Sequence, residues 1–163
     1  MNRLFVALIT FMALLVACEN RSAYGVDSVA AAQADAIERW VLNNHRPYSF
    51  VISIGSYGKP PMSVTRVYVL DSDVERTEHL SGREYRALTK FHQPLDDLHR
   101  AMAYTLMVTQ EEIVREVIDD EVSLVVSAKF ERKHGVPLRF SYNDFGFSDR
   151  SITWSISEFR FLD

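Results

Sequence analysis

Cys18 is the residue of this sequence with the clearest chemistry, and it is the only cysteine in the chain. It follows an apolar run, Leu4 to Ala17, that stands behind a single basic residue, Arg3. A short positive region, an apolar segment and small residues before a cleavage point are typical of a secretory signal peptide. The run is shorter than the roughly 20 apolar residues of a membrane-spanning helix. The sequence therefore predicts that residues 1–17 are a signal peptide.

The last residues of this segment, Leu15-Val16-Ala17-Cys18, resemble the bacterial lipobox. The resemblance implies that Cys18 is acylated and becomes the first residue of the mature protein. Lipoprotein modification places several acyl chains on one cysteine, so the anchor is expected to be stable, whereas a single chain binds only marginally. Sorting in enteric-type bacteria keeps proteins with Asp after the cysteine in the inner membrane. Here Glu19 follows, which favours the periplasmic face of the outer membrane in a Gram-negative-type bacterium.

Outside this segment, no residues have the spacing of an active site or a metal site. The histidines form no His-x-x-x-His or His-Glu-x-x-His pattern: His45, His79, His92, His99 and His134. Nucleophilic catalysis would need a motif such as Gly-x-Ser-x-Gly, whereas Gly55-Ser56-Tyr57-Gly58 is typical of a hairpin turn. The sequence therefore predicts no catalytic residue, no metal and no cofactor, and it favours a protein that is not an enzyme.

Three aromatic residues, Tyr57, Phe145 and Phe147, fall in expected turns, where core packing does not require them. They could be interaction tips for a partner, or they could fold back over the end of a sheet. The favoured function is a binding or interaction module for an envelope protein or a small ligand. The alternatives are a small-ligand carrier or hydrolase that uses a groove between helices and sheet, and an accessory lipoprotein of envelope assembly. The net charge of −4 argues against nucleic-acid binding, and we expect a monomer.

Residues 18–26 are expected to be the acylated cysteine and a short polar tether, and residues 27–163 a single α+β domain. Apolar spacing predicts a first helix capped at Asp27 or Ser28. Its expected buried stripe is Val29, Ala32, Ala36, Ile37, Trp40 and Val41. Alternating residues then predict three strands, over 48–54, 62–70 and 74–80. The third is charged, as suits the edge of a sheet.

The second half repeats the order of helix and strands. Apolar spacing predicts a helix over 94–107, with Leu95, Leu98, Ala101, Met102, Thr105 and Leu106 on its buried stripe. Thr109 and Glu112 match a capping box, which predicts a bend and a second helix over 110–119. Strands are predicted over 122–130, 138–142 and 152–161. In the last, the apolar positions change parity after Glu158, which indicates a β-bulge. The expected architecture is an antiparallel sheet of about six strands in two meanders, packed on one face by helices.

Several short motifs together are similar to those of a known group of proteins. They are Trp40, Tyr48-x-Phe50, Pro94-Leu95-Asp96-Asp97-Leu98, Gly135-Val136-Pro137-Leu138-Arg139-Phe140, Asp149, Trp154, Ile156 and Phe159. Over residues 35–162 the chain resembles a family of small bacterial lipoproteins built on a domain of unknown function. The family has no assigned activity, so the resemblance implies no catalytic residue. Many members carry a close cysteine pair in the first hairpin, and this chain has none between Ser53 and Pro61.

Overall fold

The computed structural model describes residues 25–43, 46–56, 59–84, 86–116, 124–144 and 151–162. Cys18 and the three candidate interaction tips, Tyr57, Phe145 and Phe147, lie outside the described residues. Within them, no helix is long and apolar enough to cross a membrane.

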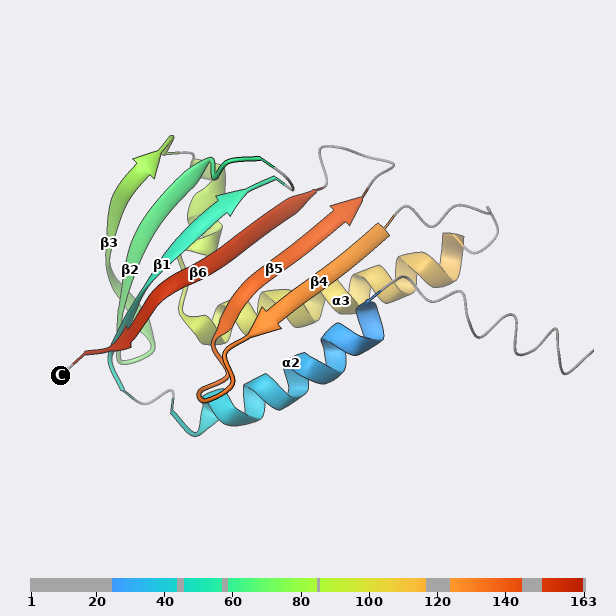
Figure 1. Cartoon of the computed structure of the whole chain (residues 1–163), viewed down its shortest axis with the longest axis horizontal. Helices are drawn as coiled ribbons and strands as arrows, with labels where there is room; N and C mark the ends of the chain where they lie inside the picture. The colour runs from blue at the N-terminus through green and yellow to red at the C-terminus, as the bar shows by residue number, and fades with distance from the viewer. Residues whose placement is uncertain are drawn as a thin grey trace, which may run out of the picture.

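A six-stranded antiparallel sheet forms the centre of the fold (Figure 1). The strands are β1 (Tyr48–Gly55), β2 (Ser63–Leu70), β3 (Asp73–Gly82), β4 (Leu124–Phe130), β5 (Pro137–Asp144) and β6 (Ile152–Phe161). Their spatial order is β3-β2-β1-β6-β5-β4. Two helices, α2 (Val26–Val41) and α3 (Leu95–Glu116), and the short 3-10 helix η1 (Arg86–Phe91) complete the described elements. This confirms the α+β class and the two meanders, and β3 is an edge strand as predicted.

The chain runs twice through the same order, a helix followed by a three-stranded meander. The two meanders join side by side where β1 pairs with β6. Figure 1 shows α3 passing behind β4 and β5, with no helix in front of these strands. The buried side chains of both helices and of the sheet form one core cluster. The helices therefore cover one face of the sheet and leave the other uncovered.

The predicted alternation in the strands is correct. Val126 on β4, Phe140 on β5, Trp154 on β6 and Ile52 on β1 are all buried in this core. The β-bulge is also confirmed, because Val51 pairs with Ser157 but Ser49 pairs with Arg160, which leaves two residues of β6 opposite Phe50. Successive strand side chains point to opposite faces. The extra residue therefore turns Phe159 inward, where its ring contacts Trp40.

The predicted buried stripe of the first helix was partly wrong. Val26, Val29, Gln33, Ala36 and Trp40 are buried, whereas Ala32 and Val41 are exposed. Gln33 can be buried because its side-chain amide donates a hydrogen bond of 2.7 Å to the backbone carbonyl of His99, which satisfies one of its polar groups.

The predicted N-cap was wrong as well. The helix begins at Val26 and its cap is Gly25, in a left-handed conformation with φ of 101°. The carbonyl of Gly25 accepts hydrogen bonds from the backbone N–H of Val29 and from the Ser28 hydroxyl.

The predicted bend after residue 107 does not occur, because α3 is one helix of 22 residues. Thr109 is buried, with 1% of its surface exposed, and it follows Met102 and Leu106 on the same face of the helix. The Thr-x-x-Glu pattern therefore lies inside the helix. Ala101 is exposed and His99 is buried. The buried face of α3 is therefore rotated about the helix axis relative to the predicted buried stripe.

Candidate binding groove between helix α3 and the sheet

A groove of about 370 Å³ opens where η1 and α3 meet β5 and β6. Its buried walls are apolar: Leu98 and Met102 from α3, Phe140 from β5 and Trp154 from β6. Its lining also includes residues with exposed or half-buried side chains: Lys90, Phe91, Gln93, Ala101, Tyr104, Thr105 and Ile152. The groove therefore combines an apolar floor with a more accessible, partly polar rim.

Helix α3 is held against the sheet at its first turn. The backbone N–H of Leu95 donates a hydrogen bond of 2.9 Å to the Tyr48 hydroxyl on β1, which satisfies one of the free donors at the helix start. Burial raises the pKa of that hydroxyl well above its usual range, although the bond from Leu95 works in the opposite direction. Leu98 and Met102, four residues apart, then face the sheet together. Ala101 lies beside them with a side chain too small to fill the space.

The lining of the groove is mainly apolar, with a few polar groups at its rim. Among the described residues, its lining contains no carboxylate, imidazole or thiol. The Thr105 hydroxyl donates to the backbone carbonyl of Ala101 at 2.9 Å, and the Lys90 ammonium lies 5.1 Å from the centre of the Phe91 ring. Nowhere in the described part of the chain do three or more possible metal ligands come together.

Two smaller hollows lie between α2 and α3. One, of about 280 Å³, is lined by Ile37, Trp40, Val41, Asp96, His99, Arg100 and Ala103. The other, of about 340 Å³, is lined mainly by alanines and larger apolar residues of the same two helices. The most unusual side chain in this region is His99, which is 3% exposed.

His99 lies parallel to the Phe130 ring, with 6.0 Å between ring centres and 6° between planes. Neither of its ring nitrogens makes a regular hydrogen bond within the described residues. Burial lowers the pKa of His99, and the opposing influence of the Gly135 carbonyl and of Asp96 does not offset it. The neutral imidazole is therefore the form that packs between α2 and β4.

We expect the free energy of unfolding to fall as the pH drops below about 6.5, the ordinary histidine pKa. In that pH range the unfolded chain binds a proton at residue 99, whereas native His99 stays neutral. The free energy of unfolding therefore decreases until the pH reaches the lower pKa of native His99. One such group contributes at most about 1.4 kcal/mol per pH unit. Urea unfolding at several pH values should show a flatter dependence for His99→Phe. The exposed His79→Gln serves as the control, and equal slopes for His99→Phe and wild type would contradict the assignment.

A groove between helices and sheet was part of the alternative functions expected from the sequence, but the sequence did not indicate which residues line it. Ala101 and Thr105 had been placed on the buried stripe, and Lys90, Phe91 and Gln93 lie in a stretch without a clear pattern. The hypothesis that Tyr57, Phe145 and Phe147 are interaction tips stays a prediction, because these residues lie outside the described part of the chain. The same holds for lipidation of Cys18.

Comparison with known proteins adds no relative: no family model, curated protein or solved structure matches the chain. The groove and the fold must therefore carry the functional argument.

Proposed function

We propose that this protein is a lipid-anchored envelope protein whose domain is a non-enzymatic binding module. Its anchor is Cys18, at the periplasmic face of a bacterial outer membrane, and its binding site is the groove between α3 and the sheet. The anchor rests on the residues Leu15 to Cys18. The resemblance to the family of small bacterial lipoproteins is part of the same proposal.

The groove is the observation that carries the binding function. Folded proteins normally fill the space between helix and sheet to a density near that of organic crystals. Here a space remains beside Trp154 and Phe140, and its rim on α3 includes the small Ala101 and the exposed Tyr104. Apolar walls with a few polar groups at the rim are typical of sites that receive an apolar group of a ligand.

Photo-crosslinking in living cells tests this site with the anchor intact. Tyr104 is 66% exposed on the rim, so p-benzoylphenylalanine can replace it with little disturbance. We expect an adduct at this position. We also expect Ala101→Phe, which fills the groove from an exposed helix position, to reduce the adduct about tenfold. Ala32→Phe on α2 is the matched control, because Ala32 is also exposed but lines none of the three hollows described above. If both variants reduce the adduct equally, or if neither does, the groove is not the binding site.

A small-ligand carrier is the second candidate function. The volume of about 370 Å³ lies at the lower end of the range of small-molecule sites, roughly 300–1,000 Å³. The mass of the Tyr104 adduct separates the two functions. A shift of a few hundred daltons would identify a carrier, and a protein-sized shift would identify an interaction module.

A further inference from the structure

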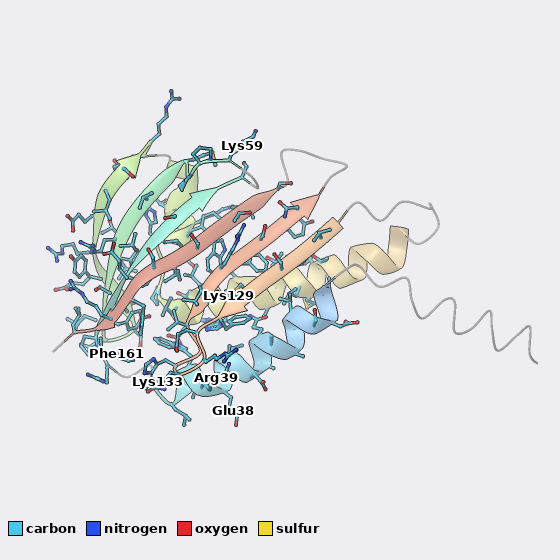
Figure 2. The ribbon with its side chains drawn as sticks, in the orientation of Figure 1. Glu38, Arg39, Lys59, Lys129, Lys133 and Phe161 are labelled. Atoms are coloured by element: carbon cyan, nitrogen blue, oxygen red, sulfur yellow. The ribbon has the colours of Figure 1, made fainter. Side chains whose placement is uncertain are left out.

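The face of the sheet opposite the helices carries a cluster of positive charge. Lys129 on β4 is directly opposite Arg139 on β5, and Arg139 is opposite Ser155 on β6. Both cationic side chains are exposed, and Lys129 lies near the middle of the view in Figure 2. Directly opposed residues of an antiparallel pair have Cβ atoms about 4.5–5.5 Å apart. The two positive charges are therefore neighbours on a surface that no helix covers.

This pair is not neutralised within the described part of the chain. Like charges directly opposite each other destabilise a sheet, and neither Lys129 nor Arg139 has an ion-pair partner among the described residues. Arg66, on the same face at β2, differs, since it pairs with Glu158 and also lies 3.9 Å from Glu78. The chain as a whole is acidic, with a net charge of −4. An unpaired basic cluster on an acidic protein indicates an anionic ligand.

The next row along the strands supplies hydroxyl groups. Ser127, Ser141 and Thr153 lie side by side on β4, β5 and β6, with Ser127 exposed, Thr153 half-buried and Ser141 buried. The Ser141 and Thr153 hydroxyls are 2.7 Å apart, and the side-chain amide of Asn143 donates to the Ser141 hydroxyl at 2.9 Å. Hydroxyl, ammonium and guanidinium groups are all donors to phosphate oxygens, and bonds between ions are the stronger ones. The patch, defined here as Lys129, Arg139, Ser127, Thr153 and Ser155, therefore has the chemistry of a phosphate site.

The tether brings this patch close to the membrane. Helix α2 begins next to β4, because a Cβ added to Gly25 would lie 2.3 Å from the Val126 carbonyl oxygen. Lys129 is on the same strand as Val126. From Cys18 to Gly25 the chain can extend over at most about 25 Å. A domain held so closely at its β4 side can place the uncovered face of the sheet on the bilayer surface.

We propose that this patch binds phosphate groups of anionic phospholipids, so that the domain lies with its uncovered sheet face on the membrane to which it is tethered. The proposal rests on the lipid anchor of the proposed function. The orientation that it gives leaves the opposite, helix-bearing side of the molecule, with the groove between α3 and the sheet, accessible to a partner.

The test measures the reactivity of Lys129 toward an amine-acylating reagent, read by mass spectrometry. The lipidated full chain is reconstituted in vesicles of phosphatidylcholine alone, or with about a third phosphatidylglycerol. A basic residue near an anionic membrane surface gains about 1 kcal/mol, which lowers the fraction of that side chain not in contact with lipid about fivefold. We therefore expect the anionic vesicles to protect Lys129 about fivefold, and high salt to remove the protection. Lys90, exposed on η1 at the helix side of the sheet, is the internal reference.

Variants separate the patch from net charge. Arg139→Gln should abolish the protection of Lys129, whereas Arg132→Gln, an equal charge change on the turn after β4, should leave it intact. Equal Lys129 reactivity in both kinds of vesicle would overturn the proposal, and so would equal effects of the two variants. If soluble glycerol phosphate protects Lys129 in the presence of neutral vesicles, the ligand of the patch is a soluble phosphate and the proposal of a membrane ligand is wrong.

Failure of the anchor gives a different result. Two measurements test the anchor: incorporation of a labelled fatty acid that is lost in Cys18→Ser, and flotation of the wild type with neutral vesicles. If the wild type shows neither, the lipid anchor is refuted. The patch is still judged in that case by the protection of Lys129 in an excess of anionic vesicles.

Discussion

Gly135→Ala should lower the free energy of unfolding by more than about 3 kcal/mol, among the largest effects of any single substitution in this domain. Gly135 ends the turn between β4 and β5 with φ of 77°, where a side chain is strained. A Cβ there would also lie 1.9 Å from the backbone oxygen of Ala36 and 3.1 Å from the backbone nitrogen of Trp40. The turn is packed directly on the backbone of α2, so alanine cannot be accommodated unless the two separate.

The turn itself has little freedom to move. The Glu131 carboxylate accepts the backbone N–H groups of Lys133 at 2.6 Å and of His134 at 2.5 Å. Burial alone would raise the pKa of Glu131, but these bonds and His134 hold it below its usual range. The carboxylate is therefore ionised in the native protein at neutral pH and fixes the turn.

Denaturant unfolding of Gly135→Ala beside Gly55→Ala measures the effect. Gly55 is the matched control, because it does not have a positive φ and its nearest neighbours to an added Cβ are at an ordinary 3.4 Å. We expect the control to change the free energy of unfolding by about 1 kcal/mol or less. If the two variants cost the same, the turn is free to lift from α2 and the packing described here does not limit stability.

Trp154→Ala should cost about 3–5 kcal/mol of unfolding free energy, as for other large aromatic side chains removed from a core. Trp154 is 3% exposed, and its ring centre lies 5.8 Å from that of Phe140. Both rings form the floor of the groove, so the truncation would also enlarge that space. Removing these contacts leaves α3 with less apolar surface to cover.

Tyr104→Ala is the control for this substitution, since Tyr104 lines the same groove but is 66% exposed. We expect it to change stability by no more than about 0.5 kcal/mol. Urea unfolding of both variants decides the case. If Trp154→Ala hardly changes the free energy of unfolding, then Trp154 does not lie on the side of the sheet that the helices cover.

The sequence by itself determined the strands and their faces. Alternation with a period of two reports directly which side chains share a face, so the core positions of β4 and β6 and the bulge after Glu158 followed from local pattern. The edge position of β3 was predicted from its charged residues, which oppose pairing with a further strand. The α+β class and the two meanders then followed from the order of elements and their short connections.

Only the tertiary structure decided which face of each helix is buried and where the groove lies. A helix presents a wide apolar stripe, and the buried Gln33 side chain donates its hydrogen bond to the backbone of His99, a residue 66 positions away in the sequence. The groove needs η1, α3 and β6 in contact, and no local pattern encodes the space left between them. The pairing of Lys129 with Arg139 likewise depends on the register between β4 and β5, which the turn between the strands and the burial of one face together determine.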